Sequence, residues 1–296
     1  MNNSTPTKQA VSSEQTPARV ATQEPPPSST RRGAASWNWL RRPLEGLISI
    51  AALLLVWQLA VVLFDIPAYV LPRPWDVLVA LVDQWDDQLA AETMVTFQES
   101  VGGFLLAIVV SVPLAILITY SDLLSRLVMP ALVIAQVIPK IALAPLFVIW
   151  LGFGILPKIL MSFLVAFFAI VVSTVVGLKN IEPNMLHLSR SMGASTLQTF
   201  LKVRLPNSLP TFFGGLKVGV TLAVIGAIVG EFVGAGSGLG HLTIIAMASL
   251  NLPLTFAAIL MMGVIGVLMY AAVEILERLA VPWKKSGELD QIQGTM

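Results

Sequence analysis

The sequence predicts an all-α membrane protein, and three observations lead to that fold class. Hydrophobic residues make up 56% of the 296 residues and charged residues only 12%, whereas a soluble domain has roughly 25% charged residues. The mean hydropathy is +0.81. The apolar residues gather in runs of about twenty, the length with which a helix crosses about 30 Å of hydrocarbon. A transmembrane barrel would instead show alternating segments of about ten residues.

The composition also excludes several function classes. The chain has no cysteine and two histidines, so disulfides and thiolate nucleophiles are ruled out and no metal site is predicted. A net charge of +1 gives no reason to expect a nucleic-acid partner. No paired aspartates or serine–histidine spacing supports an intramembrane enzyme, and no catalytic residue is predicted.

Residues 1–40 are expected to form a disordered cytoplasmic tail, because they are rich in Ser, Thr, Pro and Gln and hold little to bury. Two arginine pairs, at 31–32 and 41–42, precede the first apolar run. They resemble a twin-arginine export signal, but no small-residue cleavage site follows, so an uncleaved anchor is favoured. A second cytoplasmic tail is expected over residues 284–296.

A membrane domain over residues 41–283 is expected to contain about six spans. An acidic stretch, residues 65–92, follows the first span, and its turn at Leu71-Pro72-Arg73-Pro74 precedes a short amphipathic helix. The third span is long enough to cross but is interrupted by Pro139-Lys140 and by Pro145. The expected spans cover residues 44–64, 100–119, 127–151, 159–178, 212–233 and 255–276.

The distribution of lysine and arginine sets the expected orientation, because cations are retained on the cytoplasmic side. Twelve of them fall on one side: the two arginine pairs before span one, one cation after span two, four after span four and three after span six. The other side holds only Arg73 and Lys158. Both termini and residues 179–211 are therefore expected to be cytoplasmic.

Residues 179–211 are the most informative polar segment. Two short helical patterns flank Gly193-Ala194, where glycine allows a backbone turn or a close approach. Ser195 can cap the second helix, and Pro206 is expected to stop it. The segment therefore predicts a rigid helical elbow. On these features alone, a simple connection between spans is an equal alternative.

A resemblance to a known family gives the elbow a function. Gly193 is followed after nine residues by Val203-x-Leu205-Pro206, and then by Pro210 and Gly214-Gly215-Leu216-Lys217. This pattern resembles the EAA loop of binding-protein-dependent ABC importer permeases. The resemblance covers about residues 93–276. Further segments are similar to the nitrate/sulfonate/taurine permease branch: Leu71-Pro72-Arg73-Pro74, residues 138–146, Trp150-Leu151-Gly152-Phe153-Gly154, Pro157-Lys158 and Gly238-Leu239-Gly240.

This resemblance implies a MetI-like permease fold in the cell inner membrane and a set of partners. They are a second permease subunit, expected to be a copy of this chain, a cytoplasmic ATPase dimer that binds ATP and magnesium, and an external solute-binding protein. The branch moves nitrate, sulfonates and taurine, and near relatives take up thiamine-precursor or riboflavin-like heterocycles.

The resemblance also implies that the elbow docks in a groove of the ATPase. The family's Glu-Ala-Ala corresponds here to His187-Leu188-Ser189, a departure at the head of the motif. The chain has no G-x-x-x-x-G-K-[ST] phosphate loop, so an ATPase must be another chain, and no cofactor is expected on this one. The expected coupling residues are His187, Ser189, Arg190, Gly193, Ala194, Leu205 and Pro206.

One charged residue is expected near mid-depth of the bilayer. Lys140 lies about twelve residues into span three, where a lysine costs about 2.5 to 3.5 kcal/mol. Gln136 and Glu231 are its nearest polar candidates by depth. These three residues either line a translocation path or form a structural contact, with the lysine satisfied by carbonyls and Glu231.

Small residues follow one face of span five and predict close helix packing, either within one subunit or between two permease subunits. An autonomous secondary transporter or channel is the alternative function. It would need ionisable residues to couple ions, and the spans offer little beyond Lys140 and Glu231, with Glu99 at an entrance. The expected packing glycines are Gly215, Gly219, Gly226 and Gly230.

Overall fold

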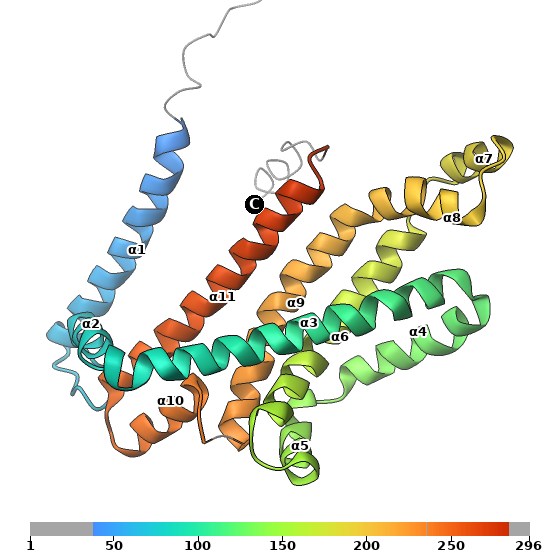
Figure 1. The fold of residues 1–296 in the computed structure, drawn as a ribbon. Helices are drawn as coiled ribbons and strands as arrows, with labels where there is room; N and C mark the ends of the chain where they lie inside the picture. The colour runs from blue at the N-terminus through green and yellow to red at the C-terminus, as the bar shows by residue number, and fades with distance from the viewer. Residues whose placement is uncertain (1–37, 235, 284–296) are drawn as a thin grey trace, which may run out of the picture. The chain divides into compact units, whose positions relative to one another are not determined.

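The computed structural model describes residues 38–234 and 236–283, with residues 38–47 described by their backbone only. Every regular element among these residues is a helix (Figure 1), which confirms the predicted all-α class. The chain divides into two compact units, residues 1–52 and 53–296. The first contains the beginning of α1 (Asn38–Leu63), and the second contains all other helices. Both predicted tails lie almost entirely outside the described residues.

Three long helices form the centre of the second unit. Helix α6 (Ile155–Lys179) packs along both α3 (Ala90–Tyr120) and α9 (Leu205–Gly234), and α11 (Leu252–Ala280) packs on α9. The main hydrophobic core lies between these helices, and a smaller one joins α3, α4 (Asp122–Val137) and α6. Many large apolar side chains on their outer faces remain exposed, as expected for helices that face lipid.

Four helical segments in the described part are long and apolar enough to cross a membrane: Trp85–Tyr120, Ile155–Lys179, Thr196–Gly234 and Leu252–Ala280. They contain the expected spans 100–119, 159–178, 212–233 and 255–276. A bent helix pair at the expected third span makes a fifth crossing if the pair is counted as one. The expected first span falls on α1, whose stretch Ile48–Leu63 is shorter.

The interruption predicted in the third span is present. Helix α4 ends at Val137, a 3-10 turn η2 (Lys140–Leu143) follows, and α5 (Ala144–Leu151) leaves at a bend of 86°. Ile138 is extended because the ring of Pro139 disfavours the helical conformation in the residue before it. The proline thus divides one apolar stretch into two helices.

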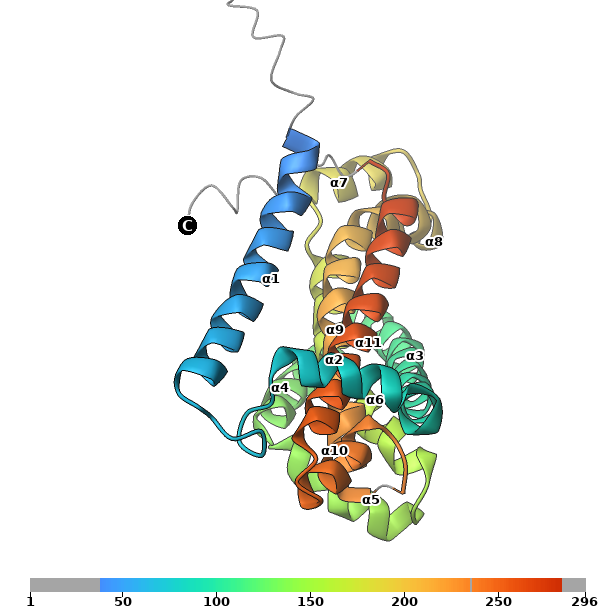
Figure 2. The same cartoon turned by 90° about the vertical axis from the view of Figure 1, so that its left-hand side faces the viewer.

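Short helices gather at the end of the bundle opposite α7 (Figure 2). Helix α2 (Pro74–Asp83) begins after the predicted turn and is followed by the π turn η1 (Trp85–Leu89). Gly238-Leu239-Gly240 lies at the start of a further helix, α10 (Leu239–Ala248). Figure 2 shows α10 and α5 together at that end.

Candidate functional site

A helical elbow between α6 and α9 forms the first candidate site. Helix α7 (Pro183–Ser191) ends in a Schellman arrangement: the Gly193 N–H donates to the Arg190 carbonyl and the Ala194 N–H to the Ser189 carbonyl, each at 3.0 Å. Gly193 has φ +74°, and a Cβ added there would meet nothing within 4 Å. The glycine therefore serves the backbone turn and not a close approach.

Ser195 caps the second elbow helix, α8 (Thr196–Thr199), as predicted. Its Oγ accepts the Gln198 N–H at 3.3 Å, and the Gln198 Oε1 accepts the Ser195 N–H at 2.9 Å. This reciprocal capping box satisfies two backbone donors that a helix start otherwise leaves free. The two motifs fix the chain direction on both sides of residue 194.

Pro206 does not end the helix, and that prediction is wrong. Helix α8 continues through the π turn η3 (Phe200–Arg204) into α9, so that Thr196–Gly234 is one helical segment. A proline ring clashes with the carbonyl four residues before it in a regular helix. Here the Leu205 N–H bonds to Phe200, five residues back, and this widened turn directly before the proline lets the helix continue.

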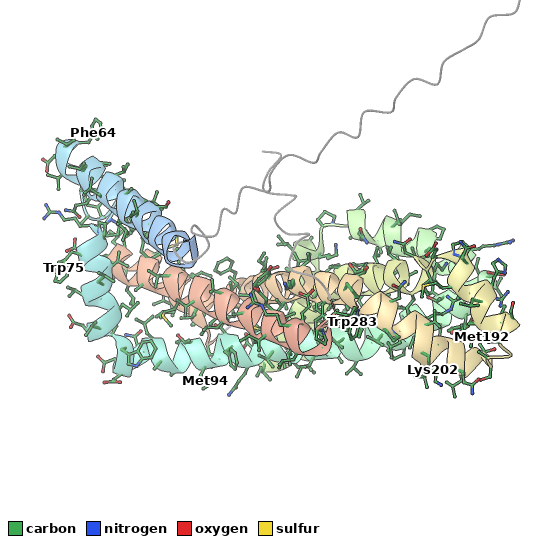
Figure 3. All side chains as sticks on the ribbon, turned by 90° about the horizontal axis from the view of Figure 1, so that it is seen from above. Phe64, Trp75, Met94, Met192, Lys202 and Trp283 are labelled. Carbon is green, nitrogen blue, oxygen red and sulfur yellow. The ribbon has the colours of Figure 1, made fainter. Side chains whose placement is uncertain are left out.

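The tip of the elbow is exposed and carries both polar and apolar side chains. His187, Arg190 and Gly193 are exposed, Ala194 and Pro206 are half-buried, and Ser189 is buried with its Oγ donating to the Leu186 carbonyl. Figure 3 shows Met192 and Lys202 at this end of the bundle. We call the exposed apolar side chains of this end the elbow surface: Met185, Leu188, Met192, Leu197, Leu201 and Leu205.

One arginine ties the elbow to the membrane helices. Arg204 donates to the Leu178 carbonyl at 3.1 Å and lies over the Tyr120 ring, 5.4 Å from its centroid. Tyr120 in turn meets Phe200 edge-on at 6.0 Å. The elbow therefore contacts the ends of α3 and α6 directly.

Lys140 and Glu231 are not brought together, although both were expected to be polar groups of one path. The Lys140 Nζ donates to the Gln136 carbonyl at 3.2 Å and lies 4.9 Å from the centre of the Phe168 ring. These contacts satisfy the lysine by a carbonyl and an aromatic ring. Of the two partners expected for Lys140, only Gln136 contacts it, and it does so through its backbone.

The predicted glycine stripe lies against α6 of the same chain. A Cβ at Gly226 would come within 2.7 Å of the Ser162 Cα, and one at Gly230 within 2.9 Å of the Lys158 Cα. α6 therefore fills this face and leaves it no room for a second subunit, in keeping with the alternative of packing within one subunit. The glycines in contact with α6 are Gly215, Gly219, Gly226 and Gly230.

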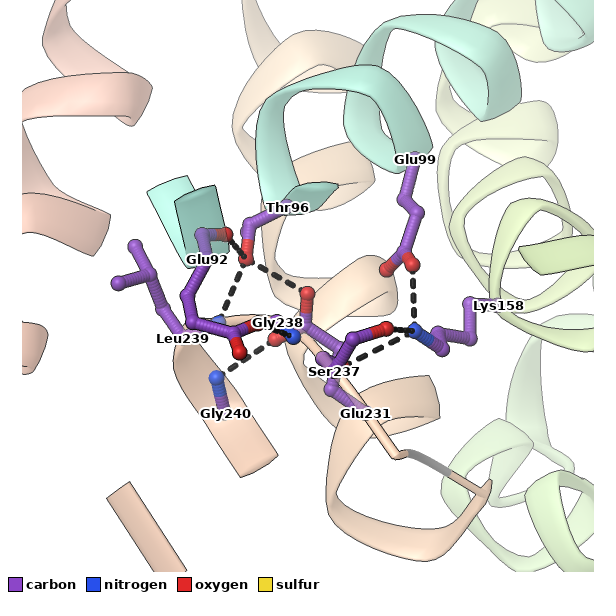
Figure 4. Close-up of polar contacts among 9 residues, drawn as sticks. All are labelled: Glu92, Thr96, Glu99, Lys158, Glu231, Ser237, Gly238, Leu239 and Gly240. Carbon is purple, nitrogen blue, oxygen red and sulfur yellow. Dashed lines mark hydrogen bonds and ion pairs between the residues drawn. The ribbon is translucent and has the colours of Figure 1, made fainter. Parts of the chain in front are cut away.

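A buried charge cluster at the opposite end of the bundle forms the second candidate site (Figure 4). Lys158 is 2% exposed and Glu99 is 0% exposed, and their side chains pair at 2.5 Å between Nζ and Oε1. The lysine also donates to the Ser237 carbonyl at 3.0 Å and the Ser237 Oγ at 3.2 Å. All three of its protons therefore have an acceptor.

Glu231 joins this cluster to the amino terminus of α10. Its Oε1 accepts the Thr96 hydroxyl and its Oε2 accepts the Gly240 N–H, each at 2.6 Å. The Thr96 Oγ1 accepts the Leu239 N–H at 2.8 Å, and Glu92 accepts the Gly238 N–H. Three successive backbone donors at a helix start, where the dipole favours negative charge, are thus satisfied by α3 and α9. We call Glu99, Lys158, Glu231 and Thr96 the buried cluster.

This cluster was not predicted. Lys158 was expected among the charges outside the membrane and Glu99 at an entrance, each one residue before an expected span. Because a charged residue lowers the local hydropathy, Glu99 and Lys158 themselves determined where the two expected spans began. The available signal was an opposite charge pair at the ends of two spans, because buried charges are paired when they occur in membrane helices.

A comparison with protein families matches residues 90–281 to the binding-protein-dependent transport system inner membrane component. Among curated proteins, the chain is 36% identical to the formylaminopyrimidine transport permease ThiX of Halalkalibacterium halodurans, covering 82% of this chain and 96% of that protein. It is 34% identical to the riboflavin transport permease RibX of Chloroflexus aurantiacus, covering 86% and 95%. It is 28% identical to the putative aliphatic sulfonates permease SsuC of Bacillus subtilis, covering 86% and 92%.

Among solved structures, a chain of the inward-facing MetNI methionine ABC transporter resembles this one with a TM-score of 0.57. The two are 22% identical, and the match covers 64% of this chain and 94% of that one. At this identity the likeness concerns the fold, which is the MetI-like arrangement that the sequence predicted.

Proposed function

The chain belongs to the family of binding-protein-dependent transport system inner membrane components, the permeases of ABC importers, and we propose that a separate cytoplasmic ATPase drives it through the elbow. The ATPase dimer binds ATP and magnesium, while two permease copies and an external solute-binding protein complete the importer. Both termini and the elbow lie on the cytoplasmic side of the inner membrane.

The elbow surface is the observation that supports this proposal. Its leucines and methionines are exposed on a segment whose backbone is fixed by the turn at Gly193 and the cap at Ser195. An exposed apolar patch on a rigid polar segment is typical of a protein interface. Arg204 then passes the motion of a docked partner to α3 and α6.

We propose a nitrogen heterocycle, related to formylaminopyrimidine or riboflavin, as the solute. The relatives named for these two compounds are 36% and 34% identical to the chain, against 28% for the sulfonate relative. Lys140, expected either to line the translocation path or to be structural, is engaged by the Gln136 carbonyl and the Phe168 ring.

An autonomous secondary transporter is the second candidate function, and the buried cluster is the observation that favours it. Ion-coupled carriers hold ionisable groups within their spans, and Glu99, Lys158 and Glu231 are such groups. The two functions differ in their energy source, so uptake by the permease without its ATPase distinguishes them.

Two variants test the elbow surface. Leu197 is 66% exposed on the elbow, and Leu250 is 69% exposed between α10 and α11 at the opposite end. Leu197→Ser should reduce both co-purification of the co-expressed ATPase and ATP-dependent uptake at least tenfold. Leu250→Ser removes the same side chain and should retain both. Equal effects of the two variants would contradict docking at the elbow.

Direct competition identifies the solute. Membrane vesicles that hold the complete importer are given radiolabelled formylaminopyrimidine, riboflavin or an aliphatic sulfonate, each alone and each with the other two in excess. Uptake of a heterocycle that is undiminished by the sulfonate supports the proposal. Uptake of the sulfonate alone would contradict it.

A further inference from the structure

One oxygen of the buried cluster lacks a hydrogen-bond donor. The Glu99 Oε1 accepts from Lys158, but the Glu99 Oε2 is buried and has no donor among the described residues. A buried acceptor without a partner costs about 1–3 kcal/mol, and more when it is charged. The described residues therefore supply no donor that would account for the burial of this oxygen.

The charges of the cluster do not balance if every group is ionised. Glu99, Glu231 and Lys158 are at most 2% exposed, and together they hold two carboxyl groups and one ammonium. The excess negative charge would lie in a buried environment, where an uncompensated ion is strongly disfavoured. When two carboxyl groups share such a site, one of them holds a proton.

The donors show which carboxyl group is the ionised one. Both oxygens of Glu231 accept hydrogen bonds, and the amino terminus of α10 favours its negative charge. Glu99 has a single donor among the residues that the structure describes. Both carboxyl groups belong to the same buried cluster (Figure 4). A proton on the free oxygen of Glu99 would therefore have Glu231 as its acceptor.

We propose that Glu99 and Glu231 form a proton-binding site that clamps α10 to α3, α6 and α9. The proton sits on the Glu99 Oε2 and is donated to ionised Glu231, while Lys158 bonds to the Glu99 Oε1. It is taken from water when these helices close together and returns to water when they separate. With the proton bound, the three buried groups are neutral overall.

The surrounding groups favour a proton over a metal ion. In the part of the chain that the structure describes, no three acidic, histidine or cysteine side chains gather at a metal-binding distance. The Lys158 ammonium already lies against the Glu99 carboxyl, where a second cation would be repelled. Glu92 on α3 is a further titratable group joined to the site, through the Gly238 N–H, and His241 directly follows Gly240 in α10.

Infrared spectroscopy of the full chain in lipid nanodiscs at neutral pH tests the site. The wild type should show the carbonyl stretch of a protonated carboxyl group, with a shift in heavy water. Glu99→Gln should lose that band and still fold, because the glutamine amide donates to Glu231 and its oxygen accepts from Lys158. Glu277→Gln is the matched control, since Glu277 also pairs with a lysine, Lys217 at 2.7 Å, and it should keep the band.

Glu231→Gln provides a second measurement that does not depend on the first variant folding. Its amide would donate to the Glu99 Oε2 and make the proton unnecessary, so the band should again be lost. A proton bound only by the folded chain makes stability fall as pH rises. The wild type should therefore show that fall, and Glu99→Gln should show less of it.

The proposal is overturned if the wild type has no protonated-carboxyl band, or if the band survives in both glutamine variants. These measurements use the permease alone. They therefore succeed or fail independently of whether an ATPase docks on the elbow.

Discussion

The elbow and the buried cluster lie at opposite ends of the same bundle and are built in opposite ways. The elbow is exposed, and its turn and cap are made by residues within a few positions of one another, from Ser189 to Gln198. The cluster is buried and joins residues as far apart as Thr96 and Glu231. An exposed local motif is available to a partner, whereas a buried network mainly determines whether helices stay together. Elbow variants should therefore change transport first, and cluster variants should change stability first.

Lys158→Met should produce the largest loss of stability. It removes the donor to the Glu99 Oε1 and the cation that balances the charge of the buried cluster, and leaving a buried charge without its partner costs about 3–5 kcal/mol. Thermal unfolding in detergent should show a much lower midpoint. Lys140→Met is the control, because Lys140 bonds only to a carbonyl of its own chain segment and a ring, and it should shift the midpoint far less. Equal midpoints would contradict the account of the cluster.

Gly226→Ala should have the next largest effect. The added Cβ would meet the backbone of α6 at Ser162 within 2.7 Å, so α6 and α9 must separate, at a cost of about 1–3 kcal/mol. Gly214→Ala, on the same helix, meets nothing within 4 Å and should be neutral or slightly stabilising. The difference between their unfolding midpoints measures how tightly this face is filled. No difference would mean that the face is open.

Gly193→Ala should separate transport from folding. The φ of +74° costs a residue with a Cβ about 1–2 kcal/mol, so the turn between α7 and α8 is displaced while the membrane helices remain. ATP-dependent uptake should fall severalfold, and a bulky residue at 193 should abolish it, while the amount of inserted protein is unchanged. Undiminished uptake by the bulky variant would contradict the coupling role of the elbow.

Ser195→Ala should have the smallest effect on stability. It removes one half of the capping box and costs about 1 kcal/mol, confined to the start of α8. Hydrogen exchange should speed up at the Gln198 amide and remain unchanged in α9 beyond Pro210. A change that spreads along α9 would show that the elbow and the membrane helices unfold as one unit.

The contrast between the two regions explains what the sequence could predict. The turn at Gly193, the cap at Ser195 and the break before Lys140 depend on residue types at short spacing, and each is where it was expected. Pro206 was misjudged because a π turn, which no propensity signals, absorbs it. The pairing of Glu99 with Lys158 depends on how α3 and α6 meet, and hydropathy had excluded both residues from their spans.

The source of energy is the central claim, and uptake into proteoliposomes tests it most directly. Vesicles are prepared with the permease alone or with its ATPase and solute-binding protein, and radiolabelled formylaminopyrimidine and riboflavin serve as probes. The account predicts accumulation only when ATPase, binding protein and ATP are all present, and none with the permease alone under a proton gradient. Accumulation by the permease alone under that gradient would contradict the account and assign the buried cluster to an autonomous transporter.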